Sequence, residues 1–342
     1  MELGTFDTSK WREAAEKLGK PRIAIVGFAG AGKSLMVNSL FGNKIASVNA
    51  RAGWTVIPQF VEHGLFELID TPGFGSDGWE ERVFVEQIIE PANLVVHLIN
   101  GASGVTDYDR DMYDLVKRHP GLIIVLNKVD ILDRDELREA VDGIVDVLSI
   151  QDDSLVLASG KQGTGLQHLV DRMTDLLPQT MKSSFVGALS GEQFTEQRAK
   201  LASEIVHYYA GLAGAVGCVP IPIADIAILA PLQIAMFIHI SRIFGHHLSK
   251  EQAGSIVGSL LSSVGARTAA QAVVSIVKAI PGLGTVLGAA AGGAMAAATF
   301  EAFGNVVILY FKHEQKISPE EIRDYYANQY EQAKKRYANN DE

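Results

Sequence analysis

A glycine-rich segment, GFAGAGKS at Gly27–Ser34, restricts the fold of this chain more than any other feature of its sequence. It follows the apolar run RIAIV, precedes a stretch with a helical pattern, and fits the spacing G-x-x-x-x-G-K-[ST]. Glycines let consecutive backbone amides curl around an anion without Cβ clashes, and the start of a helix adds a partial positive charge. The segment therefore predicts a strand, a phosphate-binding loop and a helix in direct succession.

Two side chains at the end of this loop carry the expected chemistry. Lys33 is placed to bridge the terminal phosphates of a nucleotide, and Ser34 to offer its hydroxyl to a bound Mg²⁺ ion. The remaining contacts are expected from the loop backbone and the first residues of the helix. The predicted phosphate-binding residues are Gly27, Ala29, Gly30, Ala31, Gly32, Lys33, Ser34 and Leu35.

From Pro21 to about Pro178, short apolar runs rich in β-forming residues alternate with amphipathic segments. This alternation is typical of an α/β fold with a mostly parallel sheet and crossover helices. The run VIPQFVEH is separated from FELID by only Gly64 and Leu65, so we interpret the two runs as a hairpin that makes the sheet mixed. The expected strands are RIAIVGF, FELID, NLVVHLIN, GLIIVLNK and SLVLAS, and the expected helices are 33–42, 80–90, 107–118, 134–148 and 165–177.

Two further strand ends indicate which nucleotide the loop would bind. FELIDTPGF puts Asp70 where a carboxylate can hold a Mg²⁺-bound water, and Gly73 where an amide can reach a γ-phosphate. IIVLNKVD puts Asn127, Lys128 and Asp130 at the end of another strand. A carboxylate there accepts hydrogen bonds from N1–H and N2–H₂ of guanine, which adenine does not supply, so the pattern favours GTP over ATP.

In this order, GFAGAGKS, DTPG and NKVD resemble the translation-factor-related GTPases, in particular the Era-like bacterial branch, over residues 21–180. The resemblance implies a P-loop GTPase fold that binds GTP or GDP with Mg²⁺ and hydrolyses GTP. It implies that the backbone of a last loop, normally Ser-Ala-Lys, faces the guanine O6. Thr55 is the candidate switch threonine that closes on Mg²⁺, with an ordinary loop threonine as the alternative. The last loop here is Ser159, Gly160 and Lys161; the predicted catalytic residues are Lys33, Thr55 and Gly73, and the predicted metal-binding residues are Ser34, Thr55 and Asp70.

Two residues depart from patterns found in related GTPases. Phe74 stands where some small GTPases carry a water-orienting glutamine, and a phenyl ring cannot orient or polarise water. We therefore expect slow intrinsic hydrolysis, well below about one turnover per second, unless another group completes the site. Gly30 stands where relatives activated by potassium carry asparagine, so potassium stimulation is not expected.

After Leu177 the pattern changes from alternating to helical. PQTMKSSFVGALSG is interpreted as a linker, and only six charged residues then fall between Ile205 and Phe300. A segment that is apolar all round is stable as a helix only in a packed interior or in a bilayer. The region resembles the apolar helical domain of the YcjF type found behind Era-like GTPases. The predicted domains are an N-terminal helix (1–20), a GTP-binding domain (21–180), an apolar helical domain (181–317) and a polar C-terminal helix (318–342).

Three arrangements of the helical domain stay open from the sequence. Ala279–Phe300 carries no charge and is long enough to cross a bilayer, but it is rich in Ala and Gly and is interrupted near its start by Pro281. The domain would touch a membrane through a hairpin or an amphipathic face, insert into it, or form a bundle packed only on itself. Asp225, three residues after Pro222, fits the start of a helix better than an intramembrane site.

The leading functional hypothesis is a nucleotide-dependent switch that controls membrane association of the helical domain, or its self-association as a homodimer. A ribosome-assembly or RNA-associated factor and a non-hydrolysing regulatory module are the alternatives. Thirty Lys and Arg against forty Asp and Glu give a net charge of -10, which argues against a nucleic-acid partner. The polar N-terminus carries no secretory signal, which predicts a cytoplasmic protein, with peripheral or integral attachment to the inner membrane left open.

Overall fold

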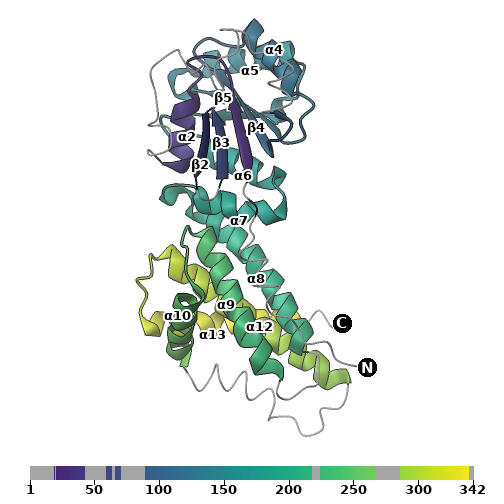
Figure 1. The fold of residues 1–342 in the computed structure, drawn as a ribbon, viewed down its shortest axis with the longest axis vertical. Helices are drawn as coiled ribbons and strands as arrows, with labels where there is room; N and C mark the ends of the chain where they lie inside the picture. Colours follow the sequence, from purple (N-terminus) through teal and green to yellow (C-terminus); the bar gives the residue numbers. More distant parts are fainter. Residues whose placement is uncertain are drawn as a thin grey trace. The chain divides into compact units, whose positions relative to one another are not determined.

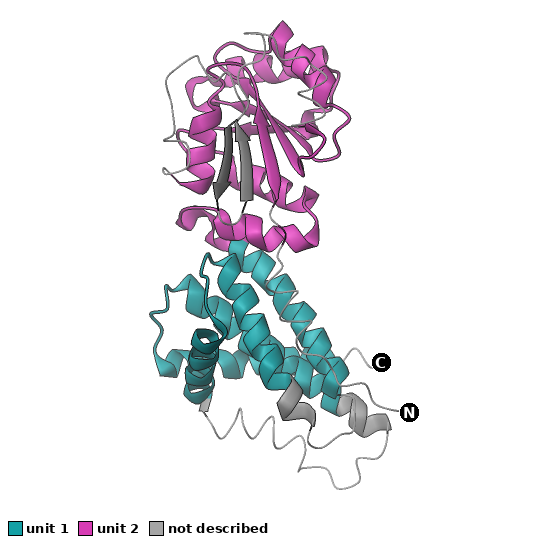
Figure 2. Ribbon diagram, viewed as in Figure 1, with its two compact units in different colours: residues 1–18, 198–342 teal, residues 19–197 magenta. Residues whose placement is uncertain are grey.

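The computed structural model describes two compact units, which are shown in Figure 2 and treated separately below. The sheet unit is Gly19–Gln197, and the helical unit is Met1–Leu18 together with Arg198–Glu342. The structure describes residues 19, 21–42, 59–63, 66–70, 89–217, 224–265 and 286–338. The predicted N-terminal helix, the candidate switch threonine and most of the predicted helix 80–90 lie outside these residues.

The sheet unit is built on a six-stranded sheet in the order β2-β3-β1-β4-β5-β6 (Figure 1). All neighbouring strands are parallel except β2 and β3, which pair antiparallel as the predicted hairpin. The P-loop GTPase fold expected from the sequence is thereby confirmed, including its mixed sheet. The strands are β1 (Arg22–Val26), β2 (Gln59–His63), β3 (Phe66–Asp70), β4 (Leu94–Asn100), β5 (Leu122–Asn127) and β6 (Leu155–Ala158).

Helices connect and cover the strands, and most of them begin where the sequence predicted. The central strands β1, β4 and β5 are buried along almost their whole length, as is usual for parallel strands covered on both faces. Met112 and Val116 of α4 pack with the β1 and β4 side chains, and Ile144 and Leu148 of α5 pack with those of β5 and β6. The helices are α2 (Lys33–Phe41), α4 (Asp107–Val116), α5 (Arg134–Leu148), α6 (Leu166–Leu176) and α7 (Gln179–Ala188), with short 3₁₀ helices η2 (Val129–Ile131), η3 (Asp152–Ser154) and η4 (Glu192–Phe194).

The linker predicted after Leu177 is wrong, because the segment forms α7 and belongs to the sheet unit. Phe185 is fully buried and meets the ring of Phe41 edge-on, with 6.1 Å between ring centroids. Ser190 N–H donates to Leu40 O at 2.8 Å, so the chain after α7 is also held against the end of α2. The sheet unit therefore extends to Gln197, beyond the boundary predicted at residue 180.

The helical unit consists of five long helices in the described part of the chain: α8 (Thr195–Gly217, of which the first three residues belong to the sheet unit), α9 (Ala224–Ile243), α10 (Lys250–Gly265), α12 (Val286–Lys312) and α13 (Pro319–Ala338). The polar α13 packs along the apolar α12. It begins with a capping box, in which Glu321 N–H donates to Ser318 Oγ and Ser318 N–H donates to Glu321 Oε2. Ile322, Tyr326 and Ala333 form its buried stripe.

One helical stretch among the described residues, Gly292–Lys312 in α12, is long and apolar enough to cross a membrane. Within the structure, 72% of its most apolar window is buried against protein. The predicted stretch Ala279–Phe300 overlaps only its first part, and residues 279–285 lie outside the described chain. The length and composition of α12 therefore suit a bundle core as well as a bilayer.

Glu301 lies in the middle of this apolar stretch and is only 3% exposed. Its Oε1 atom forms an ion pair with Nη1 of Arg336 on α13 and lies 3.9 Å from Nε2 of His207 on α8. Burial and then the hydrogen bond to Glu301 raise the pKa of Tyr337, which adds a fourth polar group. A buried carboxylate is tolerated when it is paired in this way, so the cluster connects α8, α12 and α13.

Candidate functional site

The loop between β1 and α2 has a conformation that only glycine permits at two points. Gly27 has φ +148°, and a Cβ there would lie 2.3 Å from Leu98 O. Gly32 has φ +92°, and a Cβ there would lie 2.5 Å from Asn127 Nδ2. Both distances are shorter than real Cβ contacts, so a side chain at Gly27 would push against the β4 backbone, and one at Gly32 would displace the Asn127 side chain. The glycines of the predicted motif are thus fixed by the packing as well as by phosphate binding.

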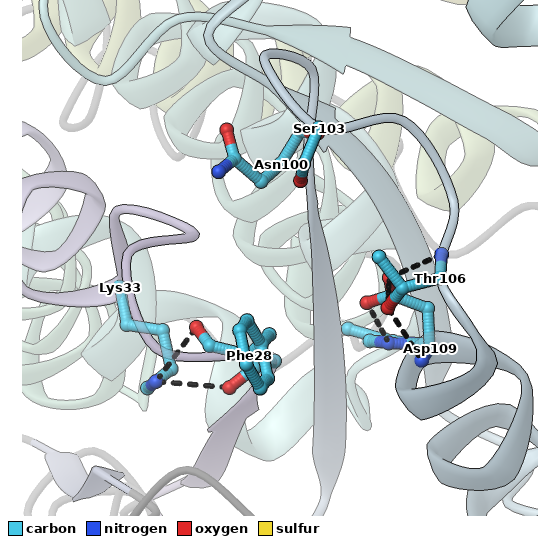
Figure 3. A network of polar contacts seen from close by, with 8 residues as sticks. Phe28, Lys33, Asn100, Ser103, Thr106 and Asp109 are labelled. Carbon is cyan, nitrogen blue, oxygen red and sulfur yellow. Dashed lines mark hydrogen bonds and ion pairs between the residues drawn. The ribbon is translucent and has the colours of Figure 1, made fainter.

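Lys33 begins α2 and turns back over the loop (Figure 3). Its Nζ donates to Gly27 O at 2.9 Å and lies 3.5 Å from Phe28 O. Residues 28–30 are exposed, and nothing lies within 4 Å of the Cβ position at Gly30. Ala29 and Leu35 are exposed as well, whereas Ala31 is fully buried and its N–H donates to Phe28 O at 3.1 Å. The loop is therefore open on one side and anchored on the other.

Asn127, at the end of β5, joins this loop to a second one. Its Nδ2 donates to Ala31 O at 2.8 Å, and its Oδ1 accepts from Gly160 N–H at 3.1 Å. The side chain is 1% exposed, and both of its partners are also buried. One amide side chain thus fixes the distance between the phosphate loop and the loop that follows β6.

Asp130 lies beyond Asn127 and is held by the same second loop. Ser159 Oγ donates to Asp130 Oδ1 at 2.6 Å and accepts from Gln162 N–H at 3.1 Å. Lys128 takes a left-handed conformation with φ +67°, which turns the chain from β5 into η2, and Lys161 is exposed. A carboxylate has about four acceptor positions, so the bond from Ser159 orients Asp130 and leaves it able to accept further hydrogen bonds.

Gly160 replaces the alanine usual in the resembled family, and the packing gives a reason. A Cβ at Gly160 would lie 3.2 Å from the backbone of Met36 in α2, which is tighter than most real contacts. Ser39 of the same helix donates its Oγ to Gly160 O. The smaller residue therefore lets α2 approach this loop closely, while its N–H is already bonded to Asn127.

The metal-binding side of the predicted site is only partly described. Ser34 is partly buried in the first turn of α2. Asp70 ends β3, and its backbone is paired with Ile25 of β1, so it lies near the strand end from which the phosphate loop emerges. Thr55, Gly73 and Phe74 lie outside the described residues. Their roles stay predictions.

A polar cluster beneath the start of α4 was missed by the sequence reasoning. His97 of β4 is completely buried, and its Nε2 lies 3.6 Å from Asp109 Oδ1. Thr106 donates to Asp109 Oδ2 from its N–H at 2.9 Å and from its Oγ1 at 2.6 Å. Burial by itself raises the pKa of Asp109, but the nearby His97 ring and the hydrogen bonds from Thr106 outweigh burial and bring the pKa below its ordinary value. The spacing Thr-x-x-Asp is the sequence signal that could have identified it.

The described residues fit a guanine nucleotide at both ends of the site. The loop at Phe28–Gly30 is exposed and presents backbone next to the start of a helix, which suits phosphate oxygens. The oriented carboxylate of Asp130 suits the two adjacent donors on the guanine edge. The Ser34 hydroxyl and a carboxylate at the end of β3 are hard oxygen ligands of the kind that Mg²⁺ prefers.

Comparison with known proteins gives a separate match for each half of the chain. Residues 22–128 match the family described as 50S ribosome-binding GTPase, and residues 174–335 match a domain of unknown function (DUF697). The chain is 30% identical over 175 residues to GTPase Der of Alkaliphilus metalliredigens, which covers 47% of this chain and 38% of Der. It is 32% identical over 169 residues to GTPase Era of Bordetella pertussis, which covers 46% of this chain and 55% of Era.

Among solved structures, Era of Aquifex aeolicus bound to GDP and AlF₄⁻ matches with a TM-score of 0.38 and 25% identity, over 56% of this chain and 67% of that one. The chain spans about 38% to 55% of the length of the two curated relatives. The resemblance found in the sequence is confirmed by the family matches to both halves. The chain therefore consists of an Era-like GTPase domain followed by a helical domain of the DUF697 family.

Proposed function

We propose that this protein binds GTP and GDP with Mg²⁺, hydrolyses GTP to GDP and phosphate, and uses the bound nucleotide to control how its helical unit associates with a membrane or with a second copy. The GTPase part is supported by the family match over residues 22–128 and by the Der and Era relatives. The control of association rests on the fusion of that domain to an apolar helical unit.

The observation that carries the guanine assignment is the pair of contacts made by Asn127 and Ser159. Asn127 connects the phosphate loop to the loop after β6, and Ser159 of that second loop orients the Asp130 carboxylate. A nucleotide spanning both loops would meet amides at its phosphates and a fixed acceptor at its base. Adenine would leave this carboxylate without its donors, which makes rejection strong.

In the proposed reaction, water attacks the γ-phosphate in line with the leaving oxygen. Lys33 would leave the Gly27 and Phe28 carbonyls and stabilise the charge that develops on the phosphates, together with the loop amides. Ser34, Thr55 and Asp70 would hold Mg²⁺, which would supply positive charge to the phosphates. Because Phe74 cannot orient water, we expect slow turnover without a partner or self-association.

The nucleotide assignment is tested by titrating the full-length protein with GDP, GTP and ATP in the presence of Mg²⁺. We expect binding of the guanine nucleotides, no measurable binding of ATP, and loss of guanine binding in Asp130→Asn, whose amide can no longer accept both base donors. Asp146→Asn, at an exposed position of α5, is the matched control and should bind as the parent does. Equal binding of ATP and GTP would refute the assignment.

The switch is tested by vesicle flotation and by light scattering, with the protein loaded with GDP or with a non-hydrolysable GTP analogue. A change of vesicle binding or of mass between the two states supports it, since a ligand shifts an equilibrium only by its differential affinity. Identical behaviour in both states contradicts it. Absence of phosphate release under every condition would leave a regulatory binding module, and GTP-dependent co-sedimentation with ribosomes would favour the RNA-associated alternative.

A further inference from the structure

The first turn of α4 is anchored unusually firmly to the interior of the sheet unit. Asp109 N–H and Thr106 Oγ1 form one half of a capping box, and Thr106 N–H with Asp109 Oδ2 forms the other. The Asp109 carboxylate is buried against His97 of β4, which is 0% exposed. The start of this helix therefore lies against a central strand through one buried contact, between Asp109 and His97.

That central strand is the neighbour of the strand that feeds the phosphate loop. In the parallel pairing of β1 and β4, His97 is the partner of Val26, and Gly27 follows immediately. The anchor of α4 and the first residue of the phosphate loop thus lie side by side on adjacent strands. A contact between α4 and the loop would join two parts that already share a rigid base.

Tyr108 makes this contact. It lies between the two ends of the capping box, and its ring meets the ring of Phe28 with 5.0 Å between centroids and 58° between planes. Phe28 is the second residue of the phosphate loop, and its side chain is 45% exposed. Tyr108 also packs partly against the core of the sheet unit, so one face of the pair is held from inside the protein.

The backbone of Phe28 takes part in the shape of the loop. Its carbonyl oxygen accepts from Ala31 N–H at 3.1 Å. The same oxygen lies 3.5 Å from Lys33 Nζ (Figure 3). Glycines before and after Phe28 make the loop backbone flexible. Without the contact to Tyr108, the Phe28 carbonyl would be free to change its orientation. Holding the Phe28 ring therefore holds the turn that brings the Ala31 amide and the Lys33 ammonium into place.

We propose that Tyr108 is a positioning residue of the nucleotide site, which clamps the first half of the phosphate loop through the Phe28 ring. The inference rests on the proposed guanine-nucleotide binding. Tyr108 acts on the nucleotide only through Phe28 and the loop backbone. The clamp acts at a different residue from Asn127, which holds the second half of the loop through Ala31 O.

The test measures dissociation of a fluorescent GDP analogue from the full-length protein after addition of excess unlabelled GDP. Tyr108→Leu keeps most of the packing against the core but loses the aromatic ring pair, and we expect dissociation to be about fivefold faster, which corresponds to about 1 kcal/mol. Tyr108→Phe should restore the parent rate. Asp111→Ala, on the exposed side of the same helix, is the control and should not change it.

A double-mutant cycle separates the clamp from general destabilisation. Phe28→Ala should also speed dissociation, and adding Tyr108→Leu to it should change little, because the partner ring is already absent. Additive effects of the two substitutions, or a parent rate in Tyr108→Leu, would overturn the proposal. So would a Tyr108→Phe variant as fast as Tyr108→Leu.

A measurement on the nucleotide-free protein tests the clamp independently of nucleotide binding. Hydrogen exchange of a peptide covering residues 27–33 should be faster in Tyr108→Leu than in the parent protein, while the β5 and β6 peptides keep their rates. If the parent does not bind the GDP analogue but this exchange difference is present, the proposed function fails and the clamp stands. If the analogue binds and neither its dissociation nor the exchange differs, the clamp fails and the function stands.

Discussion

Each unit of this protein buries polar residues, and two of them, Asn127 in the sheet unit and Glu301 in the helical unit, differ in chemistry. Asn127 in the sheet unit is neutral, and its donor and acceptor each meet a backbone group. Glu301 in the helical unit is a carboxylate in an apolar helix, and it depends on the charged side chain of Arg336. Burying an amide whose bonds are all made costs little, whereas a buried charge requires a partner of opposite sign.

The kind of partner shows which parts of the structure Asn127 and Glu301 hold together. Backbone partners are fixed by the strands and loops, so Asn127 sets a distance between two loops of a binding site. The partner of Glu301 is at the end of a long side chain, on a helix whose own surface is polar, and Arg336 is 52% exposed. Glu301 thus keeps α13 against the apolar α12, in a stretch where an unpartnered carboxylate would also oppose entry into a bilayer.

The largest effect is expected from Asn127→Ala. It leaves Ala31 O and Gly160 N–H buried without their side-chain partner, and we expect the sheet unit to lose about 3 kcal/mol of stability in the absence of nucleotide. Regional hydrogen exchange measures this loss in β1 and β5 separately from the helical unit. Asn328→Ala at an exposed position of α13 is the control. A loss as small as that of the control would mean that Asn127 is dispensable for the fold.

A smaller loss, about 2 kcal/mol, is expected for the helical unit in Arg336→Ala, since the buried Glu301 carboxylate loses its cationic partner and keeps only His207 and Tyr337 close to it. Arg323→Ala, on an exposed position of the same helix, should cost much less. The double variant Glu301→Leu/Arg336→Leu sharpens the comparison. It should be more stable than Arg336→Ala because it removes the charge together with its partner.

We expect the two units to lose stability over different ranges of acidic pH. Burial, and then the charge of Arg242, lower the pKa of His239 in α9 from 6.5 to about 4. The unfolded chain then binds more protons than the folded one between pH 6.5 and about 4, so the helical unit loses stability as pH falls through this range. Burial, and then nearby positive charge, lower the pKa of His246 too, which adds to the loss.

In the sheet unit, the Asp109 carboxyl group also loses its contribution as pH falls, but over a more acidic range. The pKa of Asp109 lies below 3.8, so its contribution persists down to that region and is lost only in stronger acid. Hydrogen exchange, corrected for the intrinsic rate at each pH, should therefore show opening of the helical unit first. His239→Phe should reduce this dependence, whereas His313→Phe, at an exposed position, should not. Simultaneous loss in both units would contradict the assignment.

The smallest effects concern the two capping boxes, which have nearly the same geometry. Thr106 caps α4 with Asp109 buried, and Ser318 caps α13 with Glu321 exposed. We expect Thr106→Ala to cost about 1.5 kcal/mol and Ser318→Ala about 0.5 kcal/mol, because only the first leaves a buried carboxylate with fewer donors. Regional exchange in the first turns of the two helices checks the order. Equal costs would show that burial of the cap is irrelevant.

Much of the sheet unit could be predicted because its signals are local. The apolar runs matched strands to within a few residues, and α5 spans Arg134–Leu148, the range expected for it. The hairpin of β2 and β3 followed from two connecting residues. α7 was missed because its polar and small residues look like a linker. Only the packing of Phe185 against Phe41 shows why it is helical.

The candidate site divides in the same way. The sequence alone determined that the motifs GFAGAGKS, DTPG and NKVD follow one another along the chain. Each motif is a short run whose residue types suit one part of the nucleotide or its metal ion. The tertiary structure decided that Asn127 joins the phosphate loop to the loop after β6, that Gly160 admits α2, and that Tyr108 meets Phe28. These contacts join residues between 33 and 121 positions apart in the chain, and only strand order and packing bring such residues together.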